Sequence, residues 1–358
     1  MGELYYLVER QSLSDLSTKM FCSYGVPEED ARILSDTLIR SDMRGVKSHG
    51  LVRVPDYVRF IGTGIWNKQT NVEIIKESGA TTTIDGHNGI AAVICNKAVE
   101  ITKRKAIQTG IAYTAVRGGN HFGEAGLWST LLCDEKEGIG GFAATSTVQI
   151  SAAPGSIVAA TGSNPFSFAF PAGKFSPVCL DIAVGTMAAG KIWEYKRLGK
   201  PLPEKSFIGP DGNYVTDANK YDIKDYTMVP FGNHKGYGLG VIMEIMTSFL
   251  AGSTFNIRRK NKPLSNHAFM AINIGSFTEY DEFIAQMEQY IEHLHSLPVR
   301  EGEHPVLYPG EIESGKEAKA EEEGVPIPAK VFEDLSDISK AKGINVEPFR
   351  KYTATYDA

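Results

Sequence analysis

The sequence of 358 residues is poor in cysteine, and its four cysteines are far apart. Cys22, Cys95, Cys133 and Cys179 form no C-x-x-C pair, so neither a zinc site nor a disulfide framework is expected. Four reduced thiols are typical of a reducing compartment, and the cytoplasm is the expected location. No His, Asp or Glu pair has a strong metal-ligand spacing either, so we expect no metal.

Long apolar runs and an excess of positive charge are also missing. No stretch of about 18 or more apolar residues occurs, so we expect no segment in a membrane. Lys and Arg number 37 against 43 Asp and Glu, which gives a net charge of −6. Nucleic acid is therefore not expected as a partner, because phosphate binding needs clustered cations. With 42% hydrophobic residues the chain can bury a substantial core.

Familiar nucleotide-binding fingerprints are absent as well. No G-x-G-x-x-G motif follows a predicted strand, and G-x-x-x-x-G-K-[ST] does not occur, so an ordinary Rossmann site cannot be argued from motifs. The G-x-S-x-G turn that carries the nucleophile of many hydrolases is also lacking.

Hydrophobic periodicity, caps and turn residues predict mainly helix in the first 60 residues and alternating strands and helices after residue 72. The predicted strands are 72–75, 81–84, 111–116, 139–145, 167–170, 178–182 and 268–274. The predicted helices of this part are 91–109, 125–133, 238–250 and 279–294. Residues 299–328 are predicted to be extended, with a last helix after Pro328. This pattern indicates an α/β or α+β fold with helices layered on a sheet.

The segment from Arg44 to Gly50 opens the first of three polar clusters. His49, Arg53 and Tyr57 are spaced by four, so a helix through them would place all three on one face. An Arg can hold a carboxylate bidentately, and a His can transfer a proton near neutral pH, which is what reduction of a 2-oxo acid needs. A surface helix with a salt bridge would give the same spacing.

The other two clusters lie beside glycines. His121 follows the predicted strand 111–116 in a Gly-rich loop, and catalytic groups of α/β proteins gather at the carboxyl ends of strands. A structural histidine is the alternative. His234 and Lys235 precede a predicted helix, whose N-terminal N–H groups and a cation could bind a phosphate or carboxylate. A helix start with an exposed Lys is the alternative there.

Taken together and in order, these motifs resemble the malate/L-lactate dehydrogenase family, NAD(P)-dependent oxidoreductases without a Rossmann fold. The matching segments are Asp42-x-Arg44-Gly45-x-x-Ser48-His49-Gly50, Asn120-His121-Phe122-Gly123, Thr161-Gly162-Ser163-Asn164-Pro165, Asp181 near Gly190-Lys191-Ile192, His234-Lys235-Gly236, and Pro309-Gly310-Glu311. One departure is Asn233, which stands where a Gly is common before His-Lys-Gly.

The resemblance implies a helical domain from both chain ends, residues 1–72 and 290–358, and a central α/β cofactor-binding domain with a mixed sheet, residues 73–289. It also implies a homodimer that transfers a hydride between NAD or NADP and a small 2-hydroxy or 2-oxo acid. Malate and oxaloacetate are the leading pair, and another 2-oxo acid or a cyclic imino acid is the alternative. A non-catalytic protein that binds small anions is the alternative from a different class.

The resemblance further implies roles for individual residues. Arg53, with Arg44 as a second candidate, is expected to grip the substrate carboxylate. Either His49 or His121 transfers the proton, and the loop position of His121 after a strand favours His121. The expected catalytic residues are His121, His49, Arg53, Ser48 and Tyr57, and the substrate-binding ones are Arg44, Arg53 and Asn120. The expected cofactor contacts are His121, Ser146, Asp181, His234, Lys235, Gly236, Gly310 and Glu311.

Overall fold

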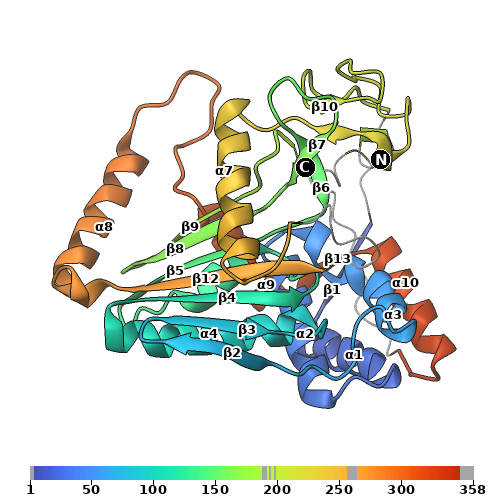
Figure 1. Ribbon diagram of the computed structural model, residues 1–358, viewed down its shortest axis with the longest axis horizontal. Coiled ribbons are helices and arrows are strands. Elements are labelled where there is room, and N and C mark those ends of the chain that lie inside the picture. Colours follow the sequence, from blue (N-terminus) through green and yellow to red (C-terminus); the bar gives the residue numbers. More distant parts are fainter. Residues whose placement is uncertain (1–3, 188–191, 193–194, 197–198, 256–263, 347–358) are drawn as a thin grey trace.

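The computed structural model describes residues 4–187, 192, 195–196, 199–255 and 264–346 (Figure 1). Its centre is a seven-stranded sheet in the order β2-β3-β4-β12-β5-β8-β9. Strands β3 and β4 run parallel and the other neighbouring pairs of this sheet run antiparallel, so the predicted mixed sheet is confirmed. The strands are β2 Glu73–Ser78, β3 Thr81–Asp85, β4 Ile111–Gly119, β12 Ser265–Asn273, β5 Ile139–Thr145, β8 Phe166–Ala172 and β9 Phe175–Ile182.

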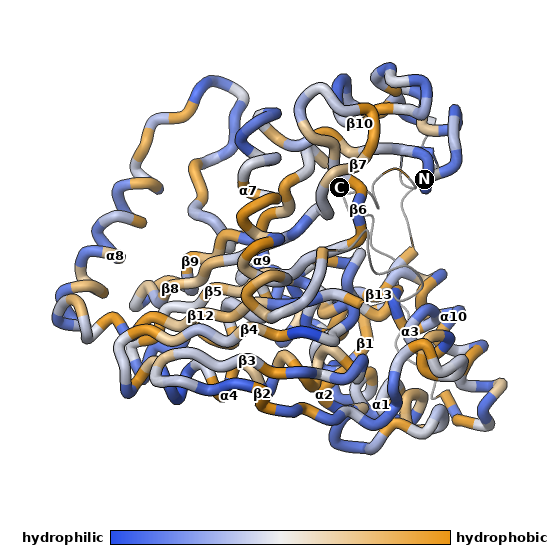
Figure 2. Tube along the Cα trace, in the orientation of Figure 1, coloured by the Kyte–Doolittle hydropathy of each residue, from blue (hydrophilic) through white to orange (hydrophobic). Residues whose placement is uncertain are grey.

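Helices cover both faces of this sheet, and every residue of β5 is buried as a result. Ala143 faces the core formed with α4 (Ala91–Thr109) and α5 (Ala125–Leu132). Its neighbours in the strand point the other way, toward Met243 of α7 (His234–Glu244), because successive side chains of a strand alternate between faces. Figure 2 shows hydrophobic residues gathered where α7 meets the sheet.

The two ends of the described chain meet in a two-stranded sheet. Strand β1 (Tyr5–Val8) pairs antiparallel with β13 (Val325–Pro328). Helices α1, α2, α3, α9 and α10 surround this pair, and α9 also contacts α2 and β9. Their bounds are α1 Arg10–Ser23, α2 Glu28–Met43, α3 Val54–Gly62, α9 Glu311–Glu323 and α10 Ala329–Ala341.

Two elements of this part correct the expectations. Strand β1 was not predicted, and α9 lies in a segment predicted to be extended. The sequence of α9 is mostly Glu, Ala and Lys, which are strong helix formers, but only Ala320 is buried. The helix therefore lacks the apolar periodicity on which a prediction depends.

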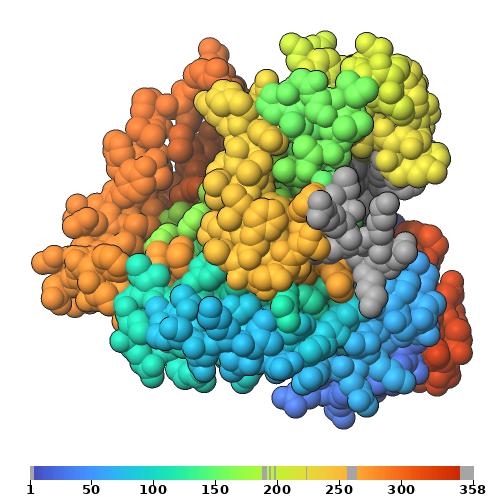
Figure 3. Space-filling model, viewed as in Figure 1, coloured from blue at the N-terminus to red at the C-terminus, as the bar shows by residue number. Residues whose placement is uncertain are grey.

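A third sheet has the order β10-β11-β6-β7 and lies beside the large one. Residues 207–228 supply part of it, and they belong to a small separate core that includes Phe207 and Met228. Figure 3 shows this part, green to yellow, as a lobe at the top right of the molecule. The strands are β6 Gln149–Ala152, β7 Ala159–Gly162, β10 Phe207–Ile208 and β11 Thr227–Met228.

Helix α8 (Tyr280–Ser296) packs beside β8 at the far end of the large sheet. Among the residues that the structure describes, no helix is both long enough and apolar enough to cross a membrane. The division of the chain at residues 72 and 290 stays a prediction.

Candidate active site

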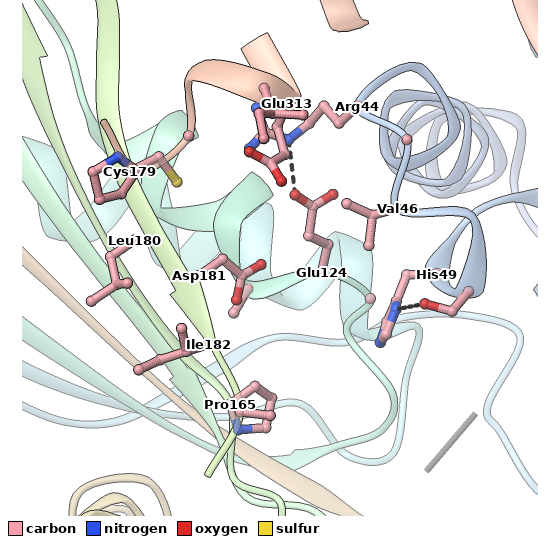
Figure 4. Close-up of a pocket in the computed structure, with 18 of the residues that line it drawn as sticks. Arg44, Val46, His49, Glu124, Pro165, Cys179, Leu180, Asp181, Ile182 and Glu313 are labelled. Carbon is pink, nitrogen blue, oxygen red and sulfur yellow. Dashed lines mark hydrogen bonds and ion pairs between the residues drawn. The ribbon is translucent and has the colours of Figure 1, made fainter. Parts of the chain in front are cut away.

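A cavity of about 980 Å³ opens between the end of α2, the start of α5, the end of β9 and the loop before α9 (Figure 4). That volume is at the upper end of the range for small-molecule and cofactor sites. The lining comes from segments that are distant in sequence: Arg44–His49, Arg53, Gly123–Ala125, Cys179–Ala183 and Leu307–Gly310, with Glu313 on α9.

Two short 3₁₀ turns, Lys47–His49 and Leu51–Arg53, carry the reactive side chains of the N-terminal part. Helix α3 begins only at Val54, so a single helix does not carry His49, Arg53 and Tyr57 together. The N–H of Leu51 donates to Oδ2 of Asp42 over 2.8 Å, and burial raises the pKa of that carboxyl to about 7. Asp42 thereby ties the junction of the two turns to α2.

His49 lies on the wall of the large cavity. Ser48 Oγ is 2.8 Å from Nδ1 of the ring, which leaves Nε2 available to a ligand. Burial and the nearby cation of Arg53 lower the pKa of His49 to about 4. The imidazole is therefore neutral at pH 7 in the free protein.

His121 lies behind His49, and the two rings stack with their centroids 5.3 Å apart. Tyr57 Oη is 2.5 Å from Nδ1 of His121. Burial raises the pKa of Tyr57 and, with His49 and Arg53, lowers that of His121, so both groups are neutral. His121 borders a small recess of about 10 Å³, room for roughly one water. It is not among the residues that line the large cavity.

Arg53 has a free end that faces a ligand site. Its Nε donates to the carbonyl of Ser48 over 2.6 Å. No described residue hydrogen-bonds to its two terminal nitrogens, although the side chain lines the cavity. A planar pair of N–H donors of this kind matches the two oxygens of a carboxylate.

Arg44 differs from Arg53 because its guanidinium is already paired. Its Nε lies 2.8 Å from Oε1 of Glu124, and its Nη1 lies 3.1 Å from Oε2 of Glu317. Burial opposes the charge of Arg44, but the two carboxylates outweigh it and raise the pKa of the guanidinium. The side chain is only 3% exposed. This geometry argues against Arg44 as the grip on a substrate and gives it a structural role.

The side chains of Asn120 and Ser146 are also engaged in hydrogen bonds inside the protein. Asn120 is fully buried, donates to the carbonyl of Gly89 and accepts the N–H of Ala91 at the start of α4 over 3.1 Å. Ser146 is equally buried, and its Oγ accepts the N–H of Asn266 over 3.1 Å. Neither lines the cavity, so the structure does not support a substrate contact for Asn120 or a cofactor contact for Ser146.

Of the two expected cofactor residues near α9, Gly310 lines the cavity and Glu311 does not. Gly310 lines the cavity with a φ of 90°, and a Cβ there would lie 2.8 Å from Cβ of Cys179. Glu311 points elsewhere, because its Oε2 accepts the N–H of Tyr308 over 3.0 Å and lies 3.0 Å from Nε2 of His295. The carboxylate that reaches the cavity from this helix is that of Glu313.

Asp181 lies at the end of β9 on the cavity wall, as Figure 4 shows. Its Oδ2 accepts the N–H of Gly126 over 2.7 Å. Enclosure by the protein, with the nearby carboxylates of Glu124 and Glu313, raises the pKa of Asp181 to about 7. Of the expected cofactor residues, Asp181 and Gly310 are therefore the two that the structure places in the large cavity.

The cluster His234, Lys235 and Gly236 forms the first turn of α7, with His234 and Lys235 exposed. A Cβ on Gly236 would lie 2.7 Å from the carbonyl oxygen of Phe231. Asn233 has a φ of 53°, a positive value that glycine adopts more readily than other residues. These residues do not line the cavity. Gly190 and Lys191 lie outside the described residues.

Three carboxylates of the cavity region, those of Glu124, Glu313 and Glu317, were not among the predicted site residues. Glu313 and Glu317 lie four residues apart on α9, but Glu124 lies just before α5, and no local spacing connects it to them. Among the described residues, no group of three or more His, Cys, Asp or Glu is arranged to hold a metal ion.

Comparison with known proteins agrees with this geometry. Residues 8–336 match a family model described as malate/L-lactate dehydrogenase. The chain is 31% identical over 355 residues to a malate dehydrogenase of Pyrococcus abyssi, covering 96% of this chain and 97% of that protein. It is 33% identical over 332 residues to an L-sulfolactate dehydrogenase of Methanocaldococcus jannaschii, covering 91% and 94%. A malate dehydrogenase structure from Entamoeba histolytica superposes with a TM-score of 0.90 at 27% identity, covering 96% of this chain and 100% of that one.

Proposed function

The chain belongs to the malate/L-lactate dehydrogenase family of oxidoreductases, and from this premise we propose that it reduces a small 2-oxo acid to its 2-hydroxy acid and catalyses the reverse. In the reduction, a hydride from NADH or NADPH adds to C2 and a proton adds to the C2 oxygen. The observation that carries the proposal is the cavity that Arg53 and His49 share. No described residue binds the two terminal nitrogens of Arg53 or Nε2 of His49.

The cavity is large enough for a dinucleotide. Gly123 on its wall has no side chain and open space beside it, so a ligand can come close to the backbone there. Asp181 and Gly310 would hold the dinucleotide, with Lys235 at the start of α7 as a further candidate. The nicotinamide, when bound, donates or accepts the hydride. The residues of the chain then supply orientation and the proton.

Arg53 binds the substrate carboxylate and so fixes the position of C2, which converts binding energy into orientation. The same contact affects His49. The cation of Arg53 contributes to the low pKa of His49, and a bound carboxylate offsets that cation. Binding of the 2-oxo acid thus favours the protonated ring, which donates its proton to the oxygen of C2 as negative charge develops there.

We propose His49 rather than His121 as the proton donor, although the loop position of His121 suggested the opposite. His49 lines the large cavity and His121 does not. Ser48 orients the ring of His49 through Nδ1, and His121 supports it from behind by stacking. Tyr57 holds His121 in turn through the hydrogen bond between its Oη and Nδ1 of the ring.

A panel of substrates tests the proposal. Oxaloacetate, pyruvate, sulfopyruvate and a cyclic imino acid are each offered with NADH and with NADPH, and absorbance at 340 nm is followed. We expect oxaloacetate to be reduced fastest. Faster turnover of the imino acid would favour the alternative of a cyclic imine reductase, and no turnover of any substrate would favour a non-catalytic protein that binds small anions.

We also propose a homodimer. Helix α7 and the π-helical segment Ile245–Phe249 that continues it expose apolar side chains on a surface with no described cover, namely Ile242, Ile245, Phe249 and Leu250, which are 37–56% exposed. Contiguous exposed apolar patches mark interaction surfaces. Light scattering coupled to gel filtration measures the mass in solution, and a monomer would contradict the proposal.

A further inference from the structure

His267 lies on β12, the central strand of the large sheet, and is fully buried. Its ring stacks face to face on the ring of Phe122, with the centroids 4.8 Å apart and the planes only 4° from parallel. Phe122 follows His121, whose ring stacks on that of His49. Two consecutive residues of the loop after β4 thus stack on other parts of the chain, one on the cavity wall and one on the sheet.

A hydrogen bond to Thr145 fixes the orientation of the His267 ring. Thr145 lies opposite His267 in the antiparallel pair of β5 and β12, and its Oγ1 is 2.9 Å from Nδ1 of the ring. The same hydroxyl lies 3.2 Å from the carbonyl oxygen of Ser146 and 3.1 Å from that of Asn266. A carbonyl oxygen only accepts, so Thr145 donates its single hydrogen to one of these two and accepts from Nδ1. Nδ1 of His267 therefore carries a hydrogen.

The other nitrogen of the His267 ring faces Gly119 at the end of β4. A Cβ on Gly119 would lie 2.4 Å from Nε2, so a larger residue there would displace the ring. The hydrogen bond to Thr145 and this close contact together leave the ring of His267 one orientation.

Packing alone does not account for a histidine at this position. An apolar side chain would fill the same space, whereas a buried polar ring costs free energy unless it is hydrogen-bonded. A fully bonded polar group inside a protein specifies a single arrangement of its surroundings. Here the arrangement is that of Phe122, because its ring is in contact with His267 and almost parallel to it.

The backbone of the loop is held on both sides of His121. The amide of Asn120 binds backbone groups at the start of α4 and just before it. The carbonyl of Phe122 accepts the indole N–H of Trp128 over 2.8 Å. With the backbone fixed in this way, the stacked rings determine how the side chains of the loop lie.

We propose that His267 is a positioning residue for proton transfer. It fixes the ring of Phe122 and with it the loop that carries His121, and the stack of His121 on His49 extends this support to the cavity wall. The inference rests on the proposed function, and it applies whichever of the two histidines donates the proton. Proton transfer needs a donor within hydrogen-bond distance of its acceptor, and a displacement of about 1 Å lowers a rate by as much as about 100-fold.

Thr145→Val tests the inference, because valine nearly keeps the shape of threonine and removes the acceptor for Nδ1 of His267. We expect kcat for the fastest substrate of the panel to fall about tenfold, while its KM and the Kd of NADH change little. The solvent isotope effect on kcat should rise, because proton transfer limits the rate more strongly in this variant. Thr145→Ser keeps the hydroxyl and should keep the kcat and the isotope effect of the wild type.

Thr114→Val is the matched control. Thr114 is also a buried threonine of the large sheet, on β4, and its Oγ1 lies 2.7 Å from that of Thr102 on α4. Both valine variants lose a buried hydrogen bond, so both should unfold at a lower urea concentration than the wild type. Only Thr145→Val should change kcat and the solvent isotope effect, because the hydrogen bond of Thr114 does not involve the stacked rings.

Two further measurements cover the case in which Thr145→Val does not fold. His267→Asn keeps an N–H donor for Thr145 but removes the ring, and its kcat should fall at least as far, with a raised isotope effect. Neutron diffraction from crystals of the wild type locates hydrogens directly and should show one on Nδ1 of His267. A hydrogen pointing from Oγ1 of Thr145 to Nδ1 would overturn the inference.

The kinetic outcomes separate the two proposals. No turnover of any substrate by the wild type would overturn the proposed function and this inference with it. An active wild type, with Thr145→Val less stable but unchanged in kcat and isotope effect, would overturn only the role of His267. An equal loss of kcat in Thr114→Val would also overturn it, because any lost buried hydroxyl would then have the same effect.

Discussion

Gly50 lies against the carboxyl group of Asp42, so closely that a Cβ atom on it would be 2.1 Å from Oδ1. The φ of Gly50 is −88°, so the requirement for glycine comes from this contact and not from the backbone conformation. Asp42 is buried and also accepts the N–H of Leu51. The turns that carry Ser48, His49 and Arg53 are therefore held to α2 at a point where no side chain fits.

Replacing Gly50 by Ala should force the two turns away from α2. We expect the free energy of unfolding in urea to fall by about 1–3 kcal/mol, the usual cost of overpacking, and kcat/KM to fall at least tenfold. Gly315→Ala is the control, because its Cβ would meet nothing within 4 Å in helix α9. That variant should be as stable as the wild type or more so. Unchanged kcat/KM in Gly50→Ala would mean that the anchor does not position the site.

The two arginines of the cavity should respond oppositely to replacement by Met. Arg44→Met leaves the carboxylate of Glu124 buried without its partner, so we expect stability to fall by about 3–5 kcal/mol. Arg53→Met should leave stability nearly unchanged and raise KM for the 2-oxo acid about 100-fold, because two charged hydrogen bonds are lost. Urea unfolding and steady-state kinetics measure both. The assignment fails if Arg44→Met raises KM as strongly while keeping its stability.

His49→Ala and His121→Ala distinguish the two candidate proton donors. Loss of the general acid should lower kcat by about 10²–10⁴, whereas the affinity for NADH should change little. We expect that result for His49→Ala and a smaller loss for His121→Ala. Tyr57→Phe, which removes only the hydroxyl that holds His121, should resemble the weaker variant. A larger loss of kcat in His121→Ala than in His49→Ala would move the role to His121.

The low pKa of His49 predicts different pH profiles for the two directions. With a pKa of about 4, the protonated fraction of the ring in the free enzyme falls tenfold for each pH unit above 5. The pH dependence of kcat/KM follows the protonation state of the free enzyme. The logarithm of kcat/KM for reduction should therefore fall with a slope near −1 between pH 5 and 8. Oxidation uses the neutral ring and should be nearly independent of pH there. A flat profile for reduction would show that another group donates the proton.

The elements predicted most accurately are those whose signals are local. Helix α4 and strand β5 match their predicted bounds, 91–109 and 139–145. Gly89 and Gly110 flank the helix, and Gly138 precedes a strand whose residues are all buried. Strand β1 has only four residues, and its partner lies near the other end of the chain. Nothing in the neighbourhood of Tyr5 indicates that pairing, so the sequence alone could not predict it.

The candidate site shows a similar limit. The spacing of His49, Arg53 and Tyr57 pointed to residues that do lie close together. Two 3₁₀ turns carry His49 and Arg53, however, and helix α3 carries Tyr57, so they do not share one helix. Motif similarity also predicted Asn120 as a substrate-binding residue, although its side-chain amide makes hydrogen bonds to the backbone of Ala91 and Gly89. A motif does not distinguish a side chain that faces a ligand from one that supports the chain, because both keep their residue type for geometric reasons.

The pairing of β1 with β13 sets an order of assembly during synthesis. Strands β2 to β12 can pair while the chain is being synthesised, but β1 can pair only after Val325–Pro328 has been synthesised. Lys47, which begins the first of the two turns, lies over the ring of Tyr5 in β1, 3.8 Å from its centroid. The turn that begins at Lys47 thus gains this support only when translation is almost finished. A chain interrupted before β13 would contain every reactive side chain of the N-terminal part and still lack the partner strand that holds β1, and with it Tyr5, in place.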